Sequence, residues 1–185
     1  IKRYTSLMPC GTALACTWNV ELVEQMFEKM ADELDRFDVD VLLSPGLNIH
    51  RNPLCGRNFE YFSEDPFVSG ELGAAYIKGV QDCGVGTSLK HFAANNQEID
   101  RGTGNSEIDE RTLREIYLKG FEIAVKKANP TSVMNAYNKL NAIFCSENEW
   151  LLKKVLREEW GYNGVVISDW GSVHNVAKAL KNGLN

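Results

Sequence analysis

The stretch GVVISD at residues 164–169 is a short apolar run that ends in a serine and a carboxylate. Its β-branched residues, bounded by turn residues, are typical of a buried strand. The same pattern recurs as VDVLLS at 39–44, GTSLKH at 86–91 and TSVMNAY at 131–137, with a weaker candidate at 12–17. The sequence therefore predicts a series of short buried strands.

Helical patterns fill the gaps between these strands. The predicted helices cover residues 20–36, 66–82, 110–128, 147–160 and 173–180. Asn19, Asp65 and Asp109 stand where N-caps are expected for the first three. A capping-box pattern at 146–149 opens the fourth helix, and Gly161 ends it.

Because strands and helices alternate, the sheet is expected to be parallel. An open doubly wound sheet and a (β/α) barrel both fit this alternation. The barrel is favoured because strands end in polar clusters at 90–91, 135–137 and 168–169, and barrels carry their chemistry at that edge. No glycine-rich dinucleotide or phosphate motif follows a strand. We expect residues 1–185 to form a single α/β domain of the (β/α)-barrel type.

Composition and charge argue against several classes of protein. A length of 185 residues suits one domain, and a formal net charge of -5 without a basic run argues against a nucleic-acid partner. No apolar run approaches the length of a membrane span. His50 and His174 have no partner at ligand spacing, so we interpret both as structural or solvated and expect neither a metal nor a cofactor.

Cysteine usage and the first residue bear on location. The five cysteines are odd in number and form no C-x-x-C pair, which favours reduced thiols over a disulfide framework. We therefore expect a cytoplasmic protein of bacterial type. The first residue is Ile1, so we expect the chain to be part of a longer protein, whose localisation signal, if it has one, lies upstream.

Asp169 is the first candidate for chemistry, because a carboxylate emerges there from a buried strand and is followed by Trp170. A carboxylate beside an indole suits the binding and cleavage of sugars, since the C–H faces of pyranose rings pack on aromatic rings. The alternative interpretation is that Asp169 caps the following helix. The pattern alone leaves both open.

Lys90 and His91 stand together at another strand end. They can hydrogen-bond vicinal sugar hydroxyls. Two alternatives remain open: a Schiff-base lysine, or a surface lysine beside a core histidine.

Two polar loops also carry candidate residues. Arg57 can fork onto hydroxyls or a carboxylate, or it can pair structurally with Glu60 or Glu64. The loop at 95–101 is either a solvated connection or a wall that faces substrate.

Several long motifs occur in order along the chain. They are GRNFEYFSEDP at 56–66, KHFAANNQEIDR at 90–101, EIDERTLREIYLKGFE at 107–122, VMNAYNKLNA at 133–142 and GVVISDWG at 164–171. Together they resemble glycoside hydrolase family three, the β-glucosidase family, over nearly the whole chain. The segment at 13–26 is similar to the start of that family's barrel. The resemblance implies that residues 1–185 are an incomplete (β/α)8 barrel of the TIM type.

The resemblance implies a role for each matching residue. Asp169 matches the family's nucleophile, and Tyr137 matches a tyrosine that hydrogen-bonds it. The residues implied to bind or wall the cleaved sugar are Arg57, Lys90, His91, Arg101, Met134 and Trp170.

The chain also departs from the family pattern. A sugar-binding aspartate and a DGP-like turn at the start of the barrel are not found, and the chain stops at NGLN, where the family runs on into a final strand. The family's general acid/base glutamate lies in a following α/β sandwich domain, which this sequence does not contain. The continuation of KHF as AANN, in place of a PGHG-like loop, favours the glucosidase branch over the N-acetylglucosaminidase branch.

The resemblance implies a retaining hydrolase of terminal β-D-glucosidic bonds, with a β-glucoside or oligosaccharide as partner and no membrane contact. Related specificities are the nearest alternatives, namely β-xylosidase or β-N-acetylglucosaminidase. A Schiff-base aldolase that uses Lys90 and a non-catalytic sugar-binding fragment are the more distant ones. We expect the 185-residue fragment alone to be inactive, and the sequence leaves a homo-oligomer of the full-length protein open.

Overall fold

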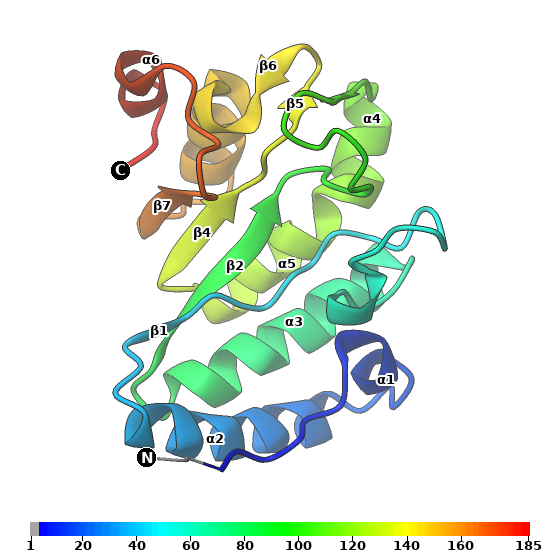
Figure 1. The fold of residues 1–185 in the computed structure, drawn as a ribbon, viewed down its shortest axis with the longest axis vertical. Coiled ribbons are helices and arrows are strands. Elements are labelled where there is room, and N and C mark those ends of the chain that lie inside the picture. Colours follow the sequence, from blue (N-terminus) through cyan, green and yellow to red (C-terminus); the bar gives the residue numbers. More distant parts are fainter. Residues whose placement is uncertain (1–3) are drawn as a thin grey trace.

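The computed structural model describes residues 4–185, which contain a four-stranded parallel sheet of order β1-β2-β4-β7. The strands are β1 (Val41–Leu42), β2 (Gly86–Phe92), β4 (Ser132–Asn135) and β7 (Val165–Ser168). All four predicted strands are therefore confirmed, although three of them are shorter than their apolar runs. Figure 1 shows β2 and β4 side by side at the centre, with their carboxyl ends toward β5 and β6.

Helices cover one face of this sheet. The helices α2 (Val20–Arg36), α3 (Pro66–Gln81) and α5 (Lys119–Ala128) lie in a row, with α3 packed between the other two (Figure 1). Buried side chains such as Phe27 of α2, Ile77 of α3 and Phe121 of α5 belong to one core, which also takes in Leu89 and Val133 of the sheet. Strand, helix and parallel strand thus alternate, which confirms the predicted α/β class.

The predicted N-caps of the first three helices are confirmed. Asn19 Oδ1 accepts the N–H of Leu22 at 2.9 Å, and Asp65 Oδ1 accepts the N–H of Phe67 at 2.7 Å. Asp109 Oδ1 accepts the N–H of Thr112 at 3.0 Å. The helix predicted over 110–128 is divided into α4 (Glu110–Thr112), a π-helical segment η2 (Leu113–Tyr117) and α5. Apolar spacing does not reveal such a division, because the π-helical turn still buries Leu113 on the same side.

Two local predictions are wrong. The run at 12–17 forms the short helix α1 (Gly11–Ala15), since so short an apolar run does not distinguish a strand from a buried helical turn. The capping box at 146–149 does not form, because Ser146 Oγ donates to the carbonyl of Ser172 at 2.8 Å. Ser146 lies in the 3-10 turn η3 (Cys145–Glu147), and Asn148 Oδ1 accepts the N–H of Leu151 at 3.0 Å instead.

The last two helices begin later than predicted. The π-helix η4 covers Trp150–Glu159, and Gly161 follows it with a φ of 72°, the left-handed conformation expected at a helix end. The helix α6 covers Val176–Lys181 and is capped by Asn175, whose Oδ1 accepts the N–H of Lys178 at 2.9 Å.

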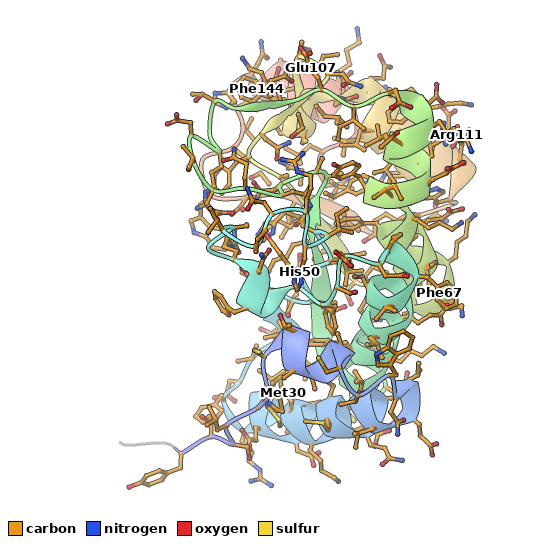
Figure 2. The ribbon with its side chains drawn as sticks, turned by 90° about the vertical axis from the view of Figure 1, so that its right-hand side faces the viewer. Met30, His50, Phe67, Glu107, Arg111 and Phe144 are labelled. Carbon is orange, nitrogen blue, oxygen red and sulfur yellow. The ribbon has the colours of Figure 1, made fainter. Side chains whose placement is uncertain are left out.

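A second, three-stranded sheet was not predicted. It consists of β3 (Asn105–Ser106), β5 (Lys139–Leu140) and β6 (Ile143–Phe144), in the order β3-β5-β6. It lies beyond the carboxyl ends of β2 and β4, and Figure 2 shows Phe144 and Glu107 at the end of the molecule opposite Met30. This sheet therefore adds a layer at the edge where the candidate residues gather.

In residues 4–185 no helix has the length and apolar character that crossing a membrane needs. Cys55 and Cys145 are buried free thiols, and Cys10, Cys16 and Cys83 are exposed free thiols. Among these described residues no group of three or more His, Cys, Asp or Glu side chains could hold a metal ion.

Candidate functional site

Asp169 lies directly after β7, at the carboxyl edge of the parallel sheet. The register places Ser168 beside Asn135 of β4, which in turn pairs with Phe92 of β2. Asp169 is only 6% exposed, and its Oδ1 accepts the N–H of Trp170 at 2.8 Å. The interpretation of Asp169 as a helix cap is wrong, because the next helix begins at Val176 and is capped by Asn175.

Residues of β4 and η3 form hydrogen bonds with the turn that follows Asp169. The Ser172 N–H donates to the carbonyl of Asp169 at 3.1 Å, and Gly171 takes a φ of 72°. Asn135 Nδ2 donates to Ser172 Oγ at 3.0 Å, and Ser146 Oγ donates to the Ser172 carbonyl. The carboxylate therefore stands on a turn that is fixed by buried hydrogen bonds.

His91 faces this carboxylate. Its Nε2 lies 3.6 Å from Asp169 Oδ2, and its Nδ1 lies 3.1 Å from the Tyr61 hydroxyl. Asn48 holds the His91 backbone by accepting its N–H at 3.0 Å and donating to its carbonyl at 2.9 Å. Burial lowers the pKa of His91 to about 2, and the charges of nearby arginine and lysine side chains act in the same direction. The imidazole is therefore neutral, and it is a core histidine that also faces a carboxylate.

Lys90 and Arg57 both pair with the carboxylate of Glu60. Lys90 Nζ lies 3.5 Å from Glu60 Oε2, and Arg57 Nε donates to Glu60 Oε1. The Lys90 side chain is 16% exposed, so the interpretation of a surface lysine is wrong. Of the two structural partners considered for Arg57, the structure selects Glu60. Both cations also stand close enough to His91 to affect its titration.

Tyr137 joins Asp169 to Arg101. The Tyr137 hydroxyl donates a hydrogen bond to Asp169, and the pKa of Tyr137 is raised first by burial and then by the Asp169 charge. Arg101 lies over the Tyr137 ring, 4.5 Å from its centroid, and its Nη1 donates to Glu98 Oε2 at 2.7 Å. Within the loop at 95–101, Glu98 and Arg101 therefore lie beside Tyr137, whereas Ile99 and Asp100 are exposed.

Met134 and Trp170 have contrasting environments. Met134 is buried within β4 and pairs with Ile167 of β7. Trp170 is 69% exposed, so its indole ring is free to pack against a bound molecule. The structure thus brings Asp169, His91 and Tyr137 into direct contact, whereas it leaves Met134 in the sheet and Trp170 at the surface.

Several residues of the site were missed as site residues by the sequence interpretation. Glu60 and Glu98 hold the cations, Tyr61 contacts His91, and Asn48 fixes the His91 backbone. Both glutamates stand three residues from an arginine. The sequence analysis considered the Arg57–Glu60 pair, and the Glu98–Arg101 pair could have been found from the same spacing. Asn48 and Tyr61 leave no such signal, because their partner is 43 and 30 residues away.

The two remaining histidines lie apart from these contacts. His174 is exposed and stacks on Phe144 of β6, with ring centroids 3.7 Å apart. The N–H of His50 donates to the carbonyl of Ser63 at 3.1 Å, in the chain between β1 and α3. Both environments agree with the interpretation of these histidines as structural or solvated.

In chemical terms, the site offers a buried carboxylate that accepts a tyrosine hydroxyl and faces a neutral imidazole. Cations of a lysine and two arginines surround this group. Such a carboxylate can attack an electrophilic carbon, and the surrounding donors suit a ligand with several hydroxyl groups.

The chain is similar in sequence to known glycosidases. The chain is 57% identical over 177 residues to thermostable beta-glucosidase B of Acetivibrio thermocellus, covering 96% of this chain and 23% of that protein. It is 51% identical over 177 residues to exo-alpha-(1->6)-L-arabinopyranosidase of Bifidobacterium longum, with the same coverage of 96% and 23%. The chain thus spans about a quarter of these relatives.

A solved structure agrees in fold. Beta-glucosidase 3B from Thermotoga neapolitana, in complex with glucose, superimposes with a TM-score of 0.96 at 59% identity over 97% of this chain and 25% of that one. The predicted fold class is thereby confirmed: the chain is part of a TIM-type barrel domain. The model of the glycosyl hydrolase family 3 N terminal domain matches residues 1–183. The chain therefore belongs to glycosyl hydrolase family 3, of whose N-terminal domain it forms a part.

Proposed function

We propose that the protein carrying this chain is a retaining glycosidase that cleaves terminal β-D-glucosidic bonds, with Asp169 as its nucleophile. The observation that carries the proposal is the buried Asp169 carboxylate at the end of β7, which accepts the Tyr137 hydroxyl and faces His91. The names of the relatives and the glucose in the solved complex support a glucoside as substrate.

In the first step, the Asp169 carboxylate attacks the anomeric carbon, and the bond to the leaving oxygen breaks. A glycosyl ester of Asp169 forms while a general acid gives its proton to the leaving oxygen. In the second step, water attacks the same carbon, gives up a proton to the same group and releases Asp169. Retaining enzymes hold the two carboxyl groups about 5–5.5 Å apart.

The nearest glutamates of this chain are poorly arranged for the acid role. Glu60 accepts Arg57 with Oε1 and faces Lys90 with Oε2, while Glu98 accepts Asn95 with Oε1 and Arg101 with Oε2. Because both oxygens of each carboxylate are already engaged, we propose that the general acid/base comes from outside these 185 residues. The α/β sandwich domain implied by the resemblance remains the proposed source.

The remaining side chains are proposed to bind the sugar. Lys90 and Arg57, oriented by Glu60, and Arg101, oriented by Glu98, present donors to hydroxyl groups. The exposed ring of Trp170 offers a face to the pyranose C–H groups.

A second specificity is favoured by one observation. Relatives at 51% identity are named exo-alpha-(1->6)-L-arabinopyranosidases, so an arabinopyranoside is a candidate substrate on the same machinery. L-arabinopyranose lacks the hydroxymethyl group of glucose and differs in the orientation of a ring hydroxyl, so the two substrates are separable by kinetics.

The full-length protein should hydrolyse p-nitrophenyl β-D-glucoside with retention. Proton NMR of the first turnovers should show β-glucose before mutarotation mixes the anomers. Initial release of α-glucose would contradict the double-displacement mechanism. A higher kcat/KM on p-nitrophenyl α-L-arabinopyranoside than on the glucoside would move the proposal to the second specificity.

Replacement of Lys90 by alanine should weaken sugar recognition. Loss of a charged hydrogen bond costs about 1.5–3 kcal/mol, so kcat/KM on the β-glucoside should fall roughly ten- to more than a hundredfold. Lys29→Ala is a matched control, because Lys29 is an exposed lysine on α2. Normal kinetics of Lys90→Ala would remove the proposed role.

A further inference from the structure

Tyr61 contacts His91 and has no assigned part in the proposed reaction. It follows the 3-10 turn η1 (Asn58–Glu60) and is completely buried. Its hydroxyl lies 3.1 Å from His91 Nδ1, and the two rings meet edge to face, with an interplanar angle of 80°. Tyr61 therefore contacts the side of the imidazole opposite to Asp169.

Two glycines, Gly46 and Gly11, let the backbone pack closely against Tyr61. A Cβ atom at Gly46 would lie 2.7 Å from Tyr61 Cε1, so the glycine lets the backbone lie against the ring. Gly46 also bridges to Lys90 of β2, next to His91. A Cβ atom at Gly11 would lie 2.7 Å from the carbonyl oxygen of Tyr61. Close packing against the ring at Gly46 and against the backbone at Gly11 limits the positions that the Tyr61 hydroxyl can take.

The hydrogen-bond chemistry then selects one tautomer of His91. A neutral imidazole has one N–H and one acceptor nitrogen, and burial keeps the pKa of His91 low enough for this form. Burial also raises the pKa of Tyr61, so its hydroxyl keeps its proton and can donate. With Nδ1 as acceptor, the N–H stands on Nε2 and points toward Asp169 Oδ2 at 3.6 Å. The other tautomer would turn the Nε2 lone pair toward a carboxylate, which is electrostatically unfavourable.

We propose that Tyr61 is a positioning residue that holds His91 as the Nε2–H tautomer, so that the imidazole donates toward Asp169 and the sugar beside it. The role rests on the proposed function of Asp169. Tyr61 is completely buried, and its hydroxyl contacts Nδ1, on the side of the imidazole away from Asp169, so it acts through His91.

The tautomer itself is open to direct measurement. The full-length protein is labelled with ¹⁵N at histidine, and the His91 signals are identified by their loss in His91→Gln. The wild-type spectrum should show an unprotonated Nδ1 and a protonated Nε2, and Tyr61→Phe should change the Nδ1 signal. A protonated Nδ1 in the wild type would overturn the proposal. Because this spectrum does not depend on turnover, it stands apart from the test of Asp169.

A double-mutant cycle tests the consequence for the reaction. Because Tyr61→Phe removes one neutral hydrogen bond, it should lower kcat/KM on the aryl β-glucoside roughly two- to tenfold. In a His91→Gln background the same change should have no further effect. An equal loss in both backgrounds would show that Tyr61 acts through general packing and would overturn the proposal.

Tyr162→Phe is the matched control for the loss of a buried tyrosine hydroxyl. Tyr162 is equally buried, and its hydroxyl donates to backbone carbonyls at Pro130 and Val165. This variant should lower the unfolding temperature while its kcat/KM stays at the wild-type value. If Asp169→Ala keeps full activity, the proposed function fails. If Asp169→Ala is inactive but the losses from Tyr61→Phe and His91→Gln are additive, the role of Tyr61 fails and the proposed function stands.

Discussion

The Asp169→Ala variant of the full-length protein is expected to lose several orders of magnitude in kcat on an aryl β-glucoside. Without the carboxylate at the end of β7, no glycosyl ester can form, and the two-step route is closed. Steady-state kinetics of the purified variant gives the measurement. Activity within about tenfold of the wild type, a difference of 1.4 kcal/mol in the barrier, would contradict the assignment.

Two controls make this result specific. Asp109→Ala removes a carboxylate that caps α4, which costs stability of about 1 kcal/mol and should leave kcat unchanged. Azide added to Asp169→Ala with a dinitrophenyl glucoside should restore turnover and give a glucosyl azide of inverted configuration. Such rescue is expected only where the missing group is the attacking one.

The isolated segment of residues 1–185 is expected to show no steady turnover of cellobiose. A natural glucoside has a poor leaving group, and the glutamates next to the site, Glu60 and Glu98, have both oxygens engaged. The outer strands β1 and β7 carry the exposed apolar side chains of Val41 and Val165, which favour association. We therefore expect low stability and at most a small burst of dinitrophenol from a dinitrophenyl glucoside.

The assay for this prediction is glucose release from cellobiose by the purified segment, beside the full-length protein at equal molar concentration. Sustained hydrolysis by the segment would mean that a carboxylate such as Glu98 or Glu64 supplies the acid. With the dinitrophenyl glucoside, a dinitrophenol burst of at most one equivalent of enzyme that then stops would agree with a nucleophile that lacks its general base.

The helices were predictable where the signal is local. The helix α2 has its predicted bounds, because amphipathic spacing and the Asn19 cap act within one segment. The capping box at 146–149 failed because Ser146 finds its partner at Ser172, far along the chain. The strands β3, β5 and β6 have two residues each, which is too short for a periodic pattern.

The residues of the site were likewise predictable from the sequence only in part. Asp169, Lys90, His91 and Tyr137 were visible as polar residues at the ends of apolar runs. Arg101 was visible in a polar loop, and the family motifs supplied the roles of Tyr137 and Arg101. Asn48 and Tyr61 became visible only in three dimensions, because the segment between β1 and α3 folds back over the end of β2.

The central claim is that Asp169 forms the covalent bond to the sugar, and active-site labelling tests it most directly. The full-length protein is inactivated with a fluorinated glucoside, digested and analysed by mass spectrometry. The account predicts a single glycosyl ester on Asp169, in the peptide that contains GVVISDWG. An ester on another carboxylate, together with an Asp169→Ala variant that still turns over β-glucosides, would contradict it.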